Sequence, residues 1–215
     1  MKFLTTLLLI IISSHCSIPQ SKNDFREFSS KFREISFPFQ INDSIAFGDW
    51  NLDDLMTTDQ IIEYNLITKY INEDYPVKLQ NCKCSRVGKY RLDDYIVLLY
   101  KTYTTEAGRG NPEIILTIFT GDGKKKDETI VLWDDAEDPF YSQKVTLSIP
   151  NNNTFVIQSI IKYNGYLQGE IVPKKVTKRM SNYEITKDGI IERKGDTVKE
   201  IFVDTNPDIL DDFPY

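Results

Sequence analysis

Histidine is almost missing from this 215-residue sequence, and the one histidine, His15, lies at the end of an apolar N-terminal run. Without imidazole beyond that point, the folded chain cannot use Ser-His-Asp or Cys-His hydrolysis, because both move a proton through histidine. Zinc sites with histidine ligands and two-histidine iron sites are excluded as well. Carboxylate chemistry and the binding of hard cations through oxygen stay open. We also expect stability to be nearly flat between pH 6 and 8.

Long hydrophobic runs and basic blocks are missing too. The longest apolar stretch is Phe3–Ile12, which is far too short for a permanent membrane span. The net charge is −6, and no basic block accompanies it, so we expect no nucleic-acid partner. Gly108-Arg109-Gly110 is not followed by a strand-to-helix transition, so we do not expect it to be a phosphate-binding loop. We expect no cofactor.

The N-terminus has the layout of an export signal. Lys2 precedes the apolar run, and small residues and Cys16 follow it. We predict a signal peptide over 1–15 and a polar tether over 16–23. A cysteine in this place favours a lipobox, in which Cys16 carries a lipid that holds the protein at a membrane. The protein would then be an outer-membrane or periplasmic lipoprotein of the cell envelope; with an ordinary cleavage site it would be secreted.

The other two cysteines, Cys82 and Cys84, are separated by one residue. A disulfide between them is one possibility outside the cytoplasm. On an extended strand, side chains two residues apart are about 6.6 Å from each other, so a bridge requires the strand to bend. The alternative is a pair of thiols near the start of a strand. Two thiolates do not fill a tetrahedral metal site.

Two stretches before residue 77 have helical character. Over 24–34, four apolar side chains form a stripe at helical spacing: Phe25, Phe28, Phe32 and Ile35. The second helix begins with a capping box of Thr57 and Gln60 and is expected to reach about Ile71, with Ile62 on its buried side. We predict that 24–76 is a helical segment packed on the body.

From residue 77 onward, short β-rich runs alternate with turn sequences. Tyr95–Tyr100 is apolar on both faces and is typical of a central strand. Tight turns are expected at Gly121–Gly123, Asn151–Asn153 and Lys187–Gly189. The sequence thus predicts a mainly β (α+β) fold, with an antiparallel β meander over 77–203 and an acidic tail over 204–215. Closure as a barrel or a sandwich stays open.

This layout resembles a known group of proteins. The features are the lipobox-like signal, Phe37-Pro38-Phe39 after a Phe-spaced helix, the strand Tyr95–Tyr100, and the hairpin sequences over 115–124 and 183–190. Together they resemble small uncharacterised secreted or lipid-anchored proteins of Bacteroidetes. The resemblance implies a compartment and a lineage, and it carries no activity.

Two acidic stretches are candidate sites. Crowded carboxylates at 134–138 can raise one another's pKa or bind calcium; the residues are Asp134, Asp135, Glu137 and Asp138. A calcium loop is also conceivable at Asp204, Asn206 and Asp208, although Ile209 stands where glycine is needed. The alternatives are a solvated loop and an acidic tail, and we expect no resident metal.

A basic cluster and several aromatic residues complete the candidates. The cluster Lys174, Lys175, Lys178 and Arg179 would split across both faces of a strand and would guard a sheet edge. Tyr90, Tyr95 and Tyr103 are either core or stacking faces. We therefore predict a non-catalytic, extracytoplasmic binding module for an unknown protein or glycan. A carboxylate-dependent glycan hydrolase using the 134–138 loop is the alternative.

Overall fold

Antiparallel strands make up most of the chain that the computed structural model describes. The described residues are 22–42, 46–47, 51–67, 71–72, 75–76, 82–104, 112–133, 141–167 and 170–202. The signal peptide, most of the tether and the acidic tail were predicted outside these ranges. Within them the mainly β prediction is confirmed, and the strands form no closed barrel.

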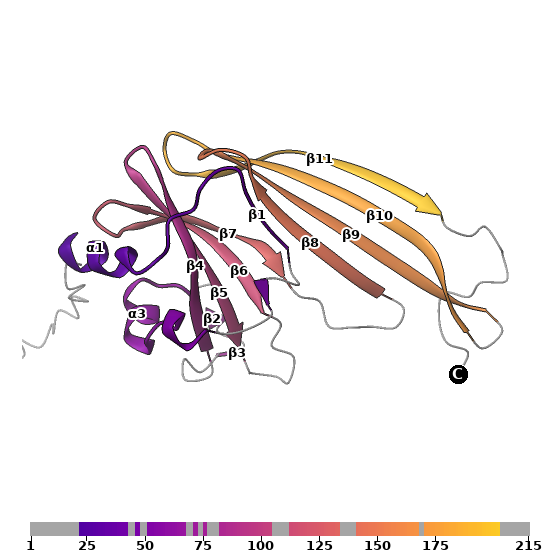
Figure 1. Ribbon diagram of the computed structural model, residues 1–215, viewed down its shortest axis with the longest axis horizontal. Coiled ribbons are helices and arrows are strands. Elements are labelled where there is room, and N and C mark those ends of the chain that lie inside the picture. The colour runs from indigo at the N-terminus through magenta and orange to yellow at the C-terminus, as the bar shows by residue number, and fades with distance from the viewer. Residues whose placement is uncertain are drawn as a thin grey trace, which may run out of the picture.

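Two antiparallel sheets contain the long strands (Figure 1). The first sheet has the order β4-β5-β6-β7, with bounds Cys82–Leu92, Tyr95–Thr104, Glu113–Thr120 and Lys125–Trp133. The second sheet has the order β1-β8-β9-β10-β11, with bounds Phe39–Asn42, Tyr141–Ile149, Thr154–Leu167, Glu170–Ile185 and Ile191–Phe202. A short hairpin pairs β2 (Ile71–Asn72) with β3 (Tyr75–Pro76).

Short helices cover one face of the first sheet. They are α1 (Lys22–Ser30), the 3-10 helix η1 (Leu52–Asp54) and α3 (Thr58–Glu63). The phenylalanine stripe of α1 is buried as predicted, and the Phe28 ring stacks on Tyr64 with ring centroids 4.0 Å apart. The predicted capping box is present, because Thr57 and Gln60 each bond the other's backbone N–H. No helix in the described ranges has the length and hydropathy needed to cross a bilayer.

The first sheet is buried on both faces. Toward the second sheet it contributes Val97 and Leu99, and toward the helices it contributes Leu98 and Tyr100. This confirms the prediction of a central strand at Tyr95–Tyr100. The layers are therefore helices, first sheet and second sheet, which is a sandwich with a helical cover.

The N-terminal segment and the β unit differ from the prediction in three ways. β1 lies within the segment expected to be helical and pairs with β8, because its Ile41 side chain joins the core between the sheets. The second helix ends at Glu63 rather than Ile71, and the chain turns at Asn65 with a positive φ of 52°. Ile62, expected to be buried, is 53% exposed.

The single meander expected over 77–203 is two meanders, since β7 does not pair with β8. The predicted turns join their strands within each sheet. At the turn between β10 and β11, Gly189 has φ of +71°, and a Cβ there would lie 2.9 Å from Tyr95. This close approach packs the hairpin against the first sheet, and only glycine satisfies both conditions.

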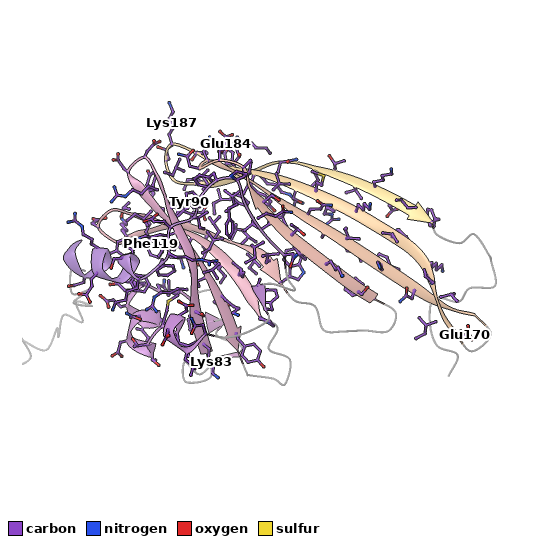
Figure 2. All side chains as sticks on the ribbon, viewed as in Figure 1. Lys83, Tyr90, Phe119, Glu170, Glu184 and Lys187 are labelled. Carbon is purple, nitrogen blue, oxygen red and sulfur yellow. The ribbon has the colours of Figure 1, made fainter. Side chains whose placement is uncertain are left out.

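The second sheet extends far beyond the first (Figure 1). We call the helices, the first sheet and the part of the second sheet that packs on it the body. In Figure 2, Glu184 lies near the body and Glu170 at the remote end, so β10 runs the whole length of the extension. We call this extension the wing; it consists of 141–144, 160–167, 170–179 and 198–202. The inner face of the second sheet is the face that packs on the first sheet, and the outer face is the opposite one.

Candidate binding face on the wing

A row of large side chains crosses the inner face of the wing. Strand register pairs Tyr141 of β8 with Tyr163 of β9, Tyr163 with Lys175 of β10, and Lys175 with Phe202 of β11. Neighbouring strands are about 4.8 Å apart, so the row spans roughly 14 Å. We call these four residues the aromatic row.

The rings and the ammonium group of the aromatic row contact one another. Tyr141 and Tyr163 meet edge to face with centroids 5.6 Å apart. The Nζ of Lys175 lies 5.7 Å from the Tyr163 centroid and 5.8 Å from the Phe202 centroid, within range of cation–π attraction to both. The same Nζ is 2.6 Å from Glu200 Oε1, which fixes it between the rings.

The aromatic row is open to solvent although it lies on the face that forms the core elsewhere. Tyr163 is 38% and Phe202 62% exposed. Further along the same face, Leu147 and Phe155 are fully buried under the first sheet. The inner face is therefore a core surface at one end and an exposed aromatic surface at the other.

Polar groups surround the aromatic row. The next row toward the body contains Gln143, Ile161, Thr177 and Glu200. The Tyr141 hydroxyl donates to Oε1 of Gln143. Exposed rings beside fixed donors and acceptors are what an amphipathic ligand needs, and here they follow one another across four strands. An extended ligand fits such a face better than a small molecule, which prefers a pocket.

A cleft beside the first sheet is lined by several cations, but these already have structural partners. Their bonds are Arg33 Nε to Val87 O (2.9 Å), Arg86 to Leu55 O and Gln60 Oε1 (3.0 Å each), and Lys101 Nζ to Ala46 O (3.0 Å). Burial lowers the pKa of Arg86, and the nearby Asp54 carboxylate opposes this shift. These cations join the N-terminal segment to the sheet, and we assign them no ligand.

Cys82 and Cys84 are both buried thiols rather than a disulfide. β4 passes through both residues without a register shift, so the strand does not bend to bring the sulfur atoms together. Burial, together with the neighbouring Cys82, raises the pKa of the Cys84 thiol to about 12. A thiol that stays protonated is a poor nucleophile and a poor metal ligand.

The cysteine, acidic and tyrosine candidates named from the sequence lie apart from this face or outside the described ranges. Cys16, the 134–138 loop (Asp134, Asp135 and Asp138 included), and Asp204, Asn206 and Asp208 are outside the described residues. Among those described, no three His, Cys, Asp or Glu side chains gather where they could hold a metal. Tyr90 is buried, as the core interpretation expected, while Tyr95 and Tyr103 are partly buried.

The basic cluster splits across the sheet as predicted: Lys175 and Arg179 face inward and Lys178 outward. Its expected role as an edge guard is wrong, because β10 lies between β9 and β11. Sequence reasoning missed Tyr141, Tyr163 and Phe202. Each is an ordinary strand residue in its own segment, and only the register of four strands brings them together.

Comparison with known proteins gives no significant match to a family model, a curated protein or a solved structure.

Proposed function

We propose that the protein is a non-catalytic binding module of the cell envelope, anchored through a lipid on Cys16, that binds an extended glycan chain on the aromatic row. The observation that carries this proposal is the line of Tyr141, Tyr163, Lys175 and Phe202 across four strands. The rings of Tyr163 and Phe202 are exposed, and Lys175 is held between them.

A glycan fits because a sugar ring offers an apolar C–H face to an aromatic ring and hydroxyl groups to the polar neighbours. The Glu200 carboxylate accepts hydrogen bonds from such hydroxyl groups, and the Gln143 side chain adds a further polar group. The described carboxylate beside the row, that of Glu200, is ion-paired with Lys175. The face therefore favours binding over hydrolysis, which needs two carboxyls across a cleft.

The binding test compares two double variants on the same strands. Tyr163→Ala/Phe202→Ala removes exposed apolar area from the inner face, whereas Met180→Ala/Ile201→Ala does so from the outer face. Affinity for arrayed envelope polysaccharides should fall about tenfold or more for the inner variant. The outer variant should bind like the wild type.

Two results contradict the glycan assignment. Equal binding by both variants would place the site elsewhere. If no glycan binds, and an envelope protein is captured by the wild type but not by the inner variant, the ligand is a protein. The anchor is tested separately: Cys16→Ser should release the protein from the membrane fraction, and unchanged fractionation would refute lipidation.

A further inference from the structure

The outer face of the second sheet has four consecutive rows without a carboxylate, and the two rows nearest the remote end of the wing contain lysines. Register gives the rows Ser142–Lys162–Val176–Ile201, Lys144–Ile160–Lys178–Lys199, Thr146–Gln158–Met180–Thr197 and Ser148–Val156–Asn182–Gly195. Asn42 and Gln40 of β1 extend the last two rows and are also uncharged. Lys144, Lys162, Lys178 and Lys199, all exposed, therefore form a basic patch on a protein of net charge −6.

The two faces of these strands differ in how their charged side chains are paired. On the inner face, cations are matched: Lys175 pairs with Glu200, and Arg193 with Asp196. The outer face has ion pairs as well at its body end, where Lys194 pairs with Glu184 and Glu192. Within the four rows, by contrast, Lys178 stands directly opposite Lys199. Like charges directly opposite each other destabilise a sheet, so the pair costs stability. Lysines gathered in rows that contain no carboxylate indicate that they serve a partner with negative charge.

The uncharged side chains around the lysines indicate which class of partner the patch fits. The two lysine rows also contain Ile160, Val176 and Ile201, and the row beside them contains Met180. Met180 and Ile201 are 42% and 38% exposed. The four rows contain no aromatic side chain, so the face lacks the stacking rings that a glycan would use. Aliphatic side chains interspersed with lysines suit the boundary between headgroups and acyl chains of a bilayer.

The patch also has the geometry for a planar partner. Its lysines spread over four strands, across roughly 14 Å, instead of lining a groove. The wing carries much of this face away from the helices and the first sheet, which pack on the inner side (Figure 1). We infer that the outer face of the second sheet docks on the surface of an anionic lipid bilayer through Lys144, Lys162, Lys178 and Lys199.

This inference does not depend on the glycan site or on the lipid anchor, so its test uses exported protein carrying Cys16→Ser, which has no lipid. The probes are vesicles of phosphatidylglycerol and phosphatidylcholine in equal parts, and vesicles of phosphatidylcholine alone. The protein should sediment with the anionic vesicles only, and high salt should release it.

The decisive variants remove the same charge from different places. Lys144→Gln/Lys178→Gln/Lys199→Gln removes three of the four positive charges of the patch. Lys83→Gln/Lys126→Gln/Lys187→Gln neutralises three exposed lysines of the first sheet and the β10–β11 turn; Lys83 and Lys187 are marked in Figure 2. Each lysine strengthens attachment to an anionic surface about fivefold, so the patch variant should bind on the order of 100-fold more weakly. The control variant should bind within about twofold of the parent.

Three outcomes would overturn the inference. One is equal loss in the patch and control variants, which would mean that net charge alone drives binding. The second is no sedimentation of the parent with anionic vesicles. The third is binding of the parent to a soluble acidic polysaccharide such as polygalacturonate, without binding to vesicles, which would assign the patch to an anionic glycan. Matching melting curves of the two triple variants exclude unfolding as the cause of a difference.

Discussion

Different interactions stabilise the body and the wing. In the body, the first sheet is covered on both faces, and Leu98, Leu99 and Tyr100 in the centre of β5 are fully buried. In the wing, residues 198–202 of β11 are exposed on both faces, and the strand is held by its pairing with β10 and by the ion pair of Lys175 with Glu200. Burial therefore stabilises the body, whereas the wing has exposed side chains on both of its faces.

The difference predicts where substitutions destabilise the protein. Body residues should cost several kcal/mol when truncated, because each leaves a cavity. Wing residues should cost little, because water replaces their contacts. The following experiments test this contrast, from the largest expected effect to the smallest.

Phe28→Ala should have the largest effect. The ring is 2% exposed and packs against both Phe32 and Tyr64. Its removal should lower the free energy of unfolding by about 3–5 kcal/mol, measured by urea denaturation. Phe202→Ala in the wing is the matched control and should change it by less than about 0.5 kcal/mol. An unshifted curve for Phe28→Ala would mean that α1 is a free tether.

Tyr100→Phe removes a fully buried hydroxyl without creating a large cavity. This hydroxyl donates to Leu66 O and bonds Thr117 Oγ1, at 3.0 Å each. The variant leaves the Leu66 carbonyl without this donor in the core, so stability should fall by about 1–3 kcal/mol. Tyr163→Phe in the wing should be nearly neutral. Equal losses for the two variants would contradict the contrast.

Alkaline pH should destabilise the body through Cys84. Its pKa rises from 9.0 in the unfolded chain to about 12 in the fold, because burial disfavours the thiolate. Between these values the unfolded state loses a proton that the folded state keeps, so stability falls as pH rises. Burial also raises the pKa of Tyr90 and of Tyr100, which adds to the fall.

Cys84→Ala isolates the contribution of this thiol. Between pH 8 and 10.5, the variant should lose about 2 kcal/mol less than the wild type, because one ionisation is gone from the unfolded state. Urea denaturation at both pH values, under reducing conditions, measures this difference. Identical pH dependence of the two proteins would show that the Cys84 thiol does not resist ionisation.

Lys175→Met tests the wing itself. The variant removes the ion pair with Glu200, whose side chain is 46% exposed, and the ammonium group between the two rings. A half-exposed ion pair contributes little, so the melting curve should shift by at most about 1 kcal/mol. Glycan binding should nevertheless weaken. A large loss of stability would mean that the wing depends on this contact.

The smallest expected effect is that of pH between 6 and 8. No histidine follows residue 15, so the folded chain has no imidazole to titrate in this range. Melting curves at pH 6, 7 and 8, with the thiols blocked, should coincide. A clear shift would indicate a carboxylate with a strongly raised pKa.

The sequence by itself determined the elements whose cause is local. The stripe of Phe25, Phe28 and Phe32, the capping box of Thr57, and the two-faced apolar strand at Tyr95–Tyr100 are readable because side-chain periodicity and backbone turns act over a few residues. The same holds for the turn at Lys187–Gly189. These features were enough to establish a mainly β fold with short helices.

Only the tertiary structure decided how these elements combine. Contacts between distant segments decide that β1 pairs with the second sheet and that β7 does not pair with β8. They also decide that the wing extends beyond the first sheet. The aromatic row and the lysine rows depend on strand register, and a slip of one residue would send every side chain to the opposite face. Tyr141 and Phe202 thus lie in one row because four strands align, a fact that no local pattern contains.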